Sequence, residues 1–202
     1  MSYRYRSGLG VVEYIIITCI VVWIATSINS RLEDALAFFP ADFARQPWTI
    51  ITSIFAHASF PNFTHILFNM ITLYFFGSFL VNAVGEGRFL LVYFVGGIAG
   101  NLLFWVLAVN HLAGVSPLSA VIGASGAIFG AGGALMVLRP RTSVYVFPIP
   151  VPIPLWIAIL GGFLLTFAAT GVAWQAHLGG LAAGALMGLI FRQRGIGRYY
   201  RR

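Results

Sequence analysis

Lysine is absent from the chain, and acidic residues are scarce: five Asp and Glu stand against twelve basic residues, all of them Arg. Charged residues make up 8% of the 202 residues, whereas soluble domains carry about 25%. So few charges cannot cover the surface of a soluble protein of this size. With 59% hydrophobic residues and a mean hydropathy of +0.91, the composition predicts an all-α protein that crosses a membrane several times.

Cysteine is almost absent as well. Cys19 stands alone in an apolar segment, which excludes an intramolecular disulfide and any cysteine-based metal site. No His-Glu-x-x-His motif occurs, so we predict neither a metal nor another cofactor. The isoelectric point near 10.2 does not indicate a nucleic-acid partner, because the arginines lie at the chain ends and in short loops and not on one soluble face.

Apolar segments close to the roughly 20 residues that cross a bilayer recur six times. We predict six transmembrane helices, at 11–29, 63–83, 89–110, 117–138, 154–171 and 173–191, in a single domain over 1–202 with an outer loop at 30–62. The alternating prolines from Pro148 to Pro154 cannot lie inside a helix, so they predict an extended entry to the fifth segment.

The arginines predict the orientation. If both termini are cytoplasmic, only Arg31 and Arg45 lie outside, in agreement with the positive-inside rule and an even number of spans. The cytoplasmic set would be Arg4, Arg6, Arg88, Arg139, Arg141, Arg192, Arg194, Arg198, Arg201 and Arg202. The first segment also resembles a signal peptide, but its removal would leave five spans, so we expect it to be retained.

Ionisable groups inside a membrane are candidates for function because their burial is costly. No acidic residue falls at the centre of a predicted helix, which excludes an aspartyl protease and argues against a proton-coupled carrier. Polar residues remain instead on the second, fourth and sixth segments: His65 with Asn69, Ser125, and His177. These three segments run in the same direction, and we expect the residues at one depth, with Ser125 about eight residues below the outer end of its helix.

Each of these features also has a structural explanation. Gly123-Ala-Ser-Gly126 could serve only close packing, Gly180 and Gly184 form a small-xxx-small pattern of helix contact, and a lone histidine can be a structural hydrogen-bonding residue. Their coincidence at one depth favours a functional site.

In order and position, His65-Ile-Leu-Phe-Asn69, Gly123-Ala-Ser-Gly126 and Ala176-His-Leu-Gly-Gly-Leu-Ala-Ala-Gly184 resemble the motifs of the rhomboid intramembrane serine proteases. The similarity runs from about Trp48 to Phe191. The sequence departs from the family's pattern at Thr49, where an arginine is common, and at Val81, where a glutamate is frequent.

The resemblance implies that Ser125 is the nucleophile and His177 its general base, and that His65, Asn69 and the Ser125 N–H form the oxyanion hole. It also implies supporting roles for six further residues. Gly123, Gly126, Gly180 and Gly184 would serve helix packing, Phe129 would support the His177 ring, and Phe68 would lie at a lateral gate. Since no acidic residue is available to orient His177, the arrangement would be a dyad.

The function we expect is hydrolysis of peptide bonds in single-span membrane proteins that enter sideways from the lipid bilayer. The expected location is a prokaryotic plasma membrane, crossed several times. A catalytically silent, client-binding relative is the alternative, although such proteins usually lack the serine or the histidine. A small transporter would show membrane charges or inverted repeats, and neither is present in the sequence.

Overall fold

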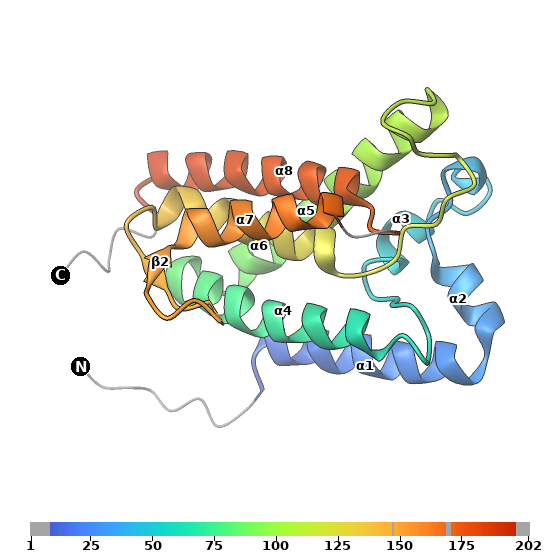
Figure 1. The fold of residues 1–202 in the computed structure, drawn as a ribbon, viewed down its shortest axis with the longest axis horizontal. Helices are drawn as coiled ribbons and strands as arrows, with labels where there is room; N and C mark the ends of the chain where they lie inside the picture. Colours follow the sequence, from blue (N-terminus) through green and yellow to red (C-terminus); the bar gives the residue numbers. More distant parts are fainter. Residues whose placement is uncertain (1–8, 147, 169–170, 197–202) are drawn as a thin grey trace.

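A computed structural model of the chain describes residues 9–146, 148–168 and 171–196. Its longer helices lie side by side in a bundle (Figure 1): α1 (Val11–Ile28), α4 (Phe63–Val84), α5 (Glu86–Val109), α6 (Ser125–Leu138), α7 (Leu155–Ala168) and α8 (Trp174–Gln193). The loop between α1 and α4 carries three short helices, α2 (Ser30–Leu36), η1 (Pro40–Asp42) and α3 (Thr49–Thr52). Each of the six predicted apolar segments therefore contains a helix.

Length and composition allow four of these helices, α1, α4, α5 and α8, to cross a membrane, and α6 and α7 are apolar but shorter. Large apolar side chains are exposed on the outside of the bundle, among them Val21, Phe75, Leu165 and Leu186. Such faces are stable in lipid and not in water. The start of α1 and the end of α8 lie at the same end of the bundle (Figure 1), while Arg4, Arg6, Arg198, Arg201 and Arg202 lie outside the described residues.

The fourth helix differs from its prediction, because it begins at Ser125 and not at residue 117. Before it, the backbone is held by the outer loop: Val121 exchanges hydrogen bonds with Phe38, and the Gly123 N–H donates to the Ser53 carbonyl at 2.9 Å. Gly123 also has a φ of 119°, which a helix cannot contain. Apolar composition alone could not reveal this, because residues 117–124 are as apolar as a turn of a transmembrane helix although they are not helical. Ser125 is thus the first residue of its helix and not eight residues inside it.

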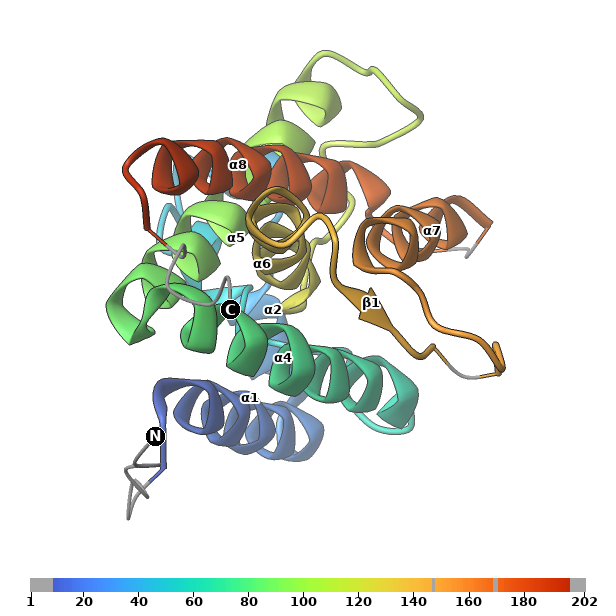
Figure 2. The ribbon, with the colours of Figure 1, turned by 90° about the vertical axis from the view of Figure 1, so that its left-hand side faces the viewer.

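Helix α6 lies at the centre of the bundle, with α4, α5, α7 and α8 around it (Figure 2). Its closest neighbour is α8, and the two meet through glycines spaced four residues apart. A Cβ atom on Gly180 would overlap the Gly126 carbonyl, and one on Gly184 would overlap the Gly130 carbonyl. The backbones are therefore in direct contact, which fixes α6 and α8 relative to each other.

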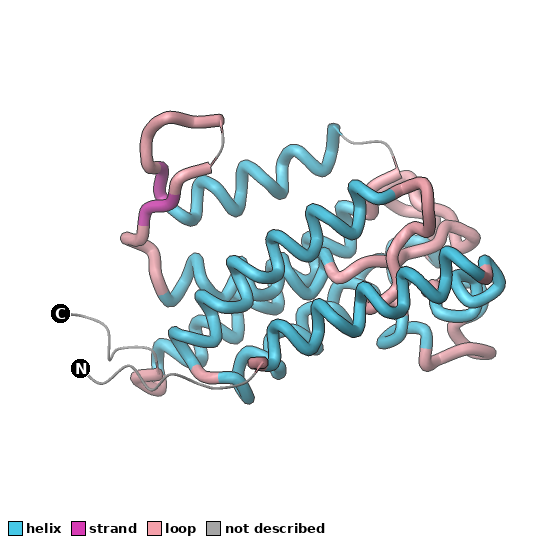
Figure 3. Tube along the Cα trace, turned by 90° about the horizontal axis from the view of Figure 1, so that it is seen from below, coloured by secondary structure: helices cyan, strands magenta, loops and turns pink. Residues whose placement is uncertain are grey.

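A short hairpin connects α6 to α7. Strands β1 (Ser143–Val144) and β2 (Ile153–Pro154) pair antiparallel, with Ser143 opposite Pro154, at the end of the bundle where α6 ends (Figure 3). Helix α7 begins at Leu155, directly after Pro154, so none of the alternating prolines lies inside the helix, as predicted. The extended entry is shorter than predicted, because Pro148 lies in a turn and only Ile153 and Pro154 form a strand.

Candidate active site

Ser125 and His177 meet at the contact between α6 and α8. The Ser125 Oγ and the His177 Nε2 are 2.7 Å apart, which is a short hydrogen bond. Ser125 is the first residue of α6 and His177 lies in the first turn of α8, so both side chains come from helix starts at the same end of the bundle. Because the glycine contact fixes the two helices, it also fixes the distance between these two groups.

The ring of His177 is held by an aromatic neighbour. Phe129, one turn along α6 from Ser125, stacks on it with ring centroids 4.7 Å apart and an interplanar angle of 30°. The Nδ1 atom of His177 is buried and has no hydrogen-bond partner among the residues that the structure describes. Among the described residues, the imidazole is therefore oriented by stacking on Phe129 and not by a carboxylate.

A turn that requires glycine brings the chain into Ser125. Gly123 has a positive φ, and a Cβ there would lie 2.8 Å from the His65 Nε2, so two independent constraints require glycine. The first hydrogen bond within α6 runs from the Ile128 N–H to the Ala124 carbonyl. The N–H groups of the preceding residues, including that of Ser125, have no partner within the helix and can bind an anion.

The loop between α1 and α4 supports this turn through His57. The His57 Nε2 accepts the Ala124 N–H at 3.4 Å, while its Nδ1 lies 3.3 Å from the Phe55 carbonyl and must donate to it. Burial, and to a smaller extent the neighbouring His65, lowers the pKa of His57 to about 3, so its ring is neutral and Nε2 is free to accept.

A second support runs through Asn101, which the sequence left without a role. Its amide donates to the Ile50 carbonyl at 2.8 Å and to the Ser53 hydroxyl at 2.9 Å. The Ser53 carbonyl in turn accepts the Gly123 N–H. An amide in the middle of an apolar helix was the only sequence signal for this link, and the sequence does not show which loop it would bind.

His65 faces the same turn from α4. Its Nδ1 accepts the N–H of Ala58 at 3.3 Å, so in the neutral ring the proton is on Nε2. This Nε2 is the atom that a Cβ on Gly123 would approach, and the same Cβ would lie 3.7 Å from the Ser125 Oγ. His65 therefore presents an N–H donor to the turn at Gly123 that leads into Ser125.

Asn69 lies one turn further along α4 and is buried. Its Nδ2 donates one hydrogen to the His65 carbonyl at 2.8 Å, which leaves the second hydrogen of this amide available. The Asn69 Oδ1 has no partner within the described residues. Among the sequence candidates, the structure thus brings together Ser125, His177, His65, Asn69 and Phe129.

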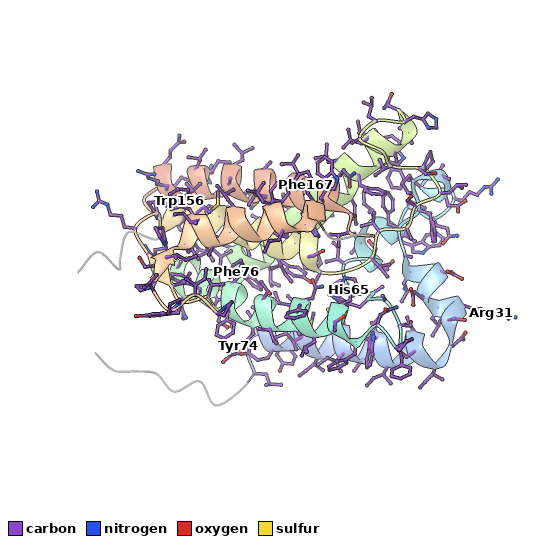
Figure 4. All side chains as sticks on the ribbon, viewed as in Figure 1. Arg31, His65, Tyr74, Phe76, Trp156 and Phe167 are labelled. Carbon is purple, nitrogen blue, oxygen red and sulfur yellow. The ribbon has the colours of Figure 1, made fainter. Side chains whose placement is uncertain are left out.

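A cavity of about 780 Å³ opens from the site between α4, α6 and α7. Ser125, Asn69 and Phe129 line it at one end, and Val144 and Tyr145 of the hairpin line it at the other. Most of its other lining residues are apolar. Phe68, the predicted gate residue, borders the cavity and is 67% exposed. Figure 4 labels Phe76, which lines this cavity from α4, and Tyr74, which does not line it.

The comparisons with known proteins agree with this architecture. Residues 44–194 match the family model of the Rhomboid domain. The chain is 35% identical over 153 residues to the yeast "Rhomboid protein 1, mitochondrial", covering 73% of this chain and 42% of the yeast protein. It is also 35% identical over 162 residues to the "Putative rhomboid protease YdcA" of Bacillus subtilis, covering 75% of this chain and 71% of that protein.

A further relative is the "Rhomboid protease GluP" of Bacillus subtilis, 34% identical over 138 residues, which are 68% of this chain but 24% of GluP. The chain thus spans less than half of two of these three relatives. The helices and the exposed apolar faces define a helical membrane protein. Within that class, the chain belongs to the rhomboid family.

Proposed function

We propose that this protein is an intramembrane serine endopeptidase that hydrolyses peptide bonds in single-span membrane proteins. One observation carries the proposal: a serine hydroxyl 2.7 Å from a histidine nitrogen, at the end of an apolar cavity bounded by membrane-type helices. The names of YdcA and GluP as rhomboid proteases support the same reaction class.

The chemistry follows from the contacts. His177 Nε2 takes the Ser125 proton as Oγ attacks the peptide carbonyl carbon. The developing oxyanion lies near the His65 Nε2–H, the free hydrogen of the Asn69 amide and the Ser125 N–H, three donors of the kind that stabilise this charge. His177 then gives its proton to the leaving amine, and a water molecule hydrolyses the acyl-serine ester by the same exchange in reverse.

The topology that we propose has six spans with both termini cytoplasmic. Helix α6, with 14 residues, is about 21 Å long at 1.5 Å per residue, while the hydrocarbon core is about 30 Å thick. If its C-terminal end reaches the cytoplasmic surface, Ser125 lies about 10 Å below the outer one. Water can reach that depth through the outer loop, and a substrate can enter from the side through the cavity between α4 and α7.

A non-enzymatic, client-binding role gains no support from this site. Ser125, His177, His65 and Asn69 are all present, and the first two are hydrogen-bonded. A protein that only binds membrane clients has no need of an oriented serine or of donors beside it.

The test is cleavage in proteoliposomes of a single-span reporter with small, helix-weakening residues at the outer end of its span. We expect the wild type to release a fragment cut within or next to that span. Ser125→Ala and His177→Ala should release none, while Ser143→Ala, a serine on β1 at the opposite end of α6, should cleave as wild type. Equal cleavage by Ser125→Ala would refute the proposal.

A further inference from the structure

The turn that leads into α4 is held from the N-terminal part of the chain. Trp23 of α1 donates its indole N–H to the Ala58 carbonyl at 3.0 Å, and the Phe60 N–H donates to the Ser27 hydroxyl at 3.1 Å. Glu33 of α2 accepts two hydrogen bonds from Ser59, one from its backbone N–H at 3.0 Å and one from its hydroxyl. Three consecutive residues, 58–60, are thus fixed by three side chains.

The held turn is also the partner of His65. The Ala58 N–H donates to the His65 Nδ1, and this contact assigns the proton of the neutral ring to Nε2. A ring with the proton on Nδ1 could not accept from Ala58 and would present an acceptor, not a donor, to the turn at Gly123. The position of the Ala58 peptide therefore decides whether His65 can stabilise an oxyanion.

Glu33 is the charged member of the three holding side chains. Hydrogen bonds to an ionised carboxylate are stronger than those between neutral groups, and both donors of Ser59 converge on the same oxygen. Ser59 is the neighbour of Ala58, so a displacement of the Ser59 backbone also moves the Ala58 N–H. Helix α2 lies at the same end of the bundle as His65, as the labelled Arg31 and His65 in Figure 4 show.

We propose that Glu33 is a positioning residue for the oxyanion hole, acting through Ser59 and the Ala58 N–H to hold His65 in the Nε2–H tautomer. This inference rests on the proposed function for its catalytic consequence, but the tautomer itself does not depend on activity. Glu33 lies before residues 44–194, the part that matches the Rhomboid domain, whereas Ser59, Ala58 and His65 lie within it.

The experiment compares Glu33→Ala with the matched control Asp34→Ala, an exposed acid next to it on α2. Nitrogen-15 NMR of histidine-labelled protein reports the tautomer of His65, and His65→Gln identifies its signals among the four histidines. Steady-state cleavage separates kcat from KM, and thermal unfolding reports stability. Ser59→Ala, which keeps the backbone contact and removes the hydroxyl contact, is a milder variant in case Glu33→Ala does not fold.

We expect wild type and Asp34→Ala to show the Nε2–H form of His65 only. Glu33→Ala should show a mixture of tautomers and a kcat about tenfold lower at unchanged KM, less than the roughly 10²–10³-fold loss on removal of an oxyanion donor. Ser59→Ala should show the same change in smaller measure. An unchanged tautomer in Glu33→Ala, or a loss of activity explained by unfolding alone, would overturn the inference.

The two proposals fail in different ways. If the wild type neither cleaves nor reacts with a serine probe, the proposed function is wrong, and the NMR spectra still decide whether Glu33 controls the ring of His65. If the wild type cleaves and Glu33→Ala keeps both tautomer and kcat, the protease remains and Glu33 has no positioning role.

Discussion

The two sides of α6 are built in opposite ways. Toward α8, glycines bring backbone against backbone, and no space is left for even one added carbon at Gly180 or Gly184. Toward α4 and α7, aromatic and aliphatic side chains surround a cavity of about 780 Å³. Ser125 lies where the two sides meet, so its hydrogen bond is made on the rigid side and its access is on the open side.

This difference allows a fixed serine–histidine distance and room for a substrate to occur in one site. A serine and a histidine must keep a distance within a few tenths of an ångström to exchange a proton, whereas a membrane-embedded substrate needs room to enter. Close packing of small residues meets the first demand, because two backbones in contact cannot shift easily. Phe68 and Phe75 line the cavity, and we expect their long aromatic side chains to meet the second demand by a change of rotamer that moves no helix.

The largest expected effect on cleavage follows from changes to Ser125 or His177, where the two sides of α6 meet. Ser125→Ala and His177→Ala should each lower kcat by on the order of 10⁶, and the double variant should be no worse than either, because the pair acts as a unit. Their melting temperatures should stay close to wild type. The measurement is the cleavage rate of the reporter in proteoliposomes, and additive losses in the double variant would contradict a shared step.

The second prediction applies one substitution to both sides. Gly180→Ala should lower the melting temperature and abolish most cleavage, because the new Cβ overlaps the Gly126 carbonyl and forces α8 away from α6. Overpacking of this kind costs about 1–3 kcal/mol or more. Gly161→Ala on α7, where an added Cβ meets no atom within 4 Å, should leave stability unchanged or slightly higher. Equal losses of stability and cleavage in the two variants would show that the two sides of α6 are not packed differently.

The third prediction concerns the Asn69 amide, one of the hydrogen-bond donors proposed for the oxyanion. Asn69→Ala should lower kcat about 10²-fold with little change in KM, because the amide is expected to act on charge that develops only in the transition state. A change confined to KM would show instead that Asn69 contributes only to substrate binding.

The smallest effect is expected in the cavity. Ala158→Phe fills space between α7 and α4 and should raise the KM for the membrane reporter by about tenfold, since each tenfold needs only about 1.4 kcal/mol. Reaction of Ser125 with a small fluorophosphonate should be unaffected. Ile157→Phe, on the exposed face of α7, is the control for added bulk. Equal KM values for the two variants would place the substrate path elsewhere.

The positions of most helices could be predicted from the sequence, because hydrophobic length is a property of single segments. The positions of α1, α4, α5, α7 and α8 follow the apolar runs within a few residues. The start of α6 did not follow its apolar run. The backbone before Ser125 is held out of the helix by the pairing of Val121 with Phe38 and by the positive φ of Gly123, and Phe38 lies far away in the sequence.

In the site, too, the sequence indicates some residues but not the contacts that hold them. The residue types of Ser125, His177, His65 and Asn69 and the resemblance to rhomboid motifs indicate these four residues, and they lie together in the structure. The position expected for Ser125 within its helix was wrong. The partners of His57 and Asn101, and the contact of Glu33 with Ser59, could not be predicted, because each contact joins residues more than 20 positions apart through a backbone group. Every residue type except proline has the same backbone donor and acceptor, so the sequence does not show which backbone group a side chain will bind.

The most direct test of the account is covalent labelling of the folded protein by a fluorophosphonate probe, which reacts only with an activated serine. The account predicts that wild type is labelled, that the label maps to Ser125, and that Ser125→Ala is not labelled while Ser143→Ala is. A folded wild type that resists the probe, or a Ser125→Ala variant that still takes it, would contradict the claim that Ser125 and His177 form a catalytic dyad.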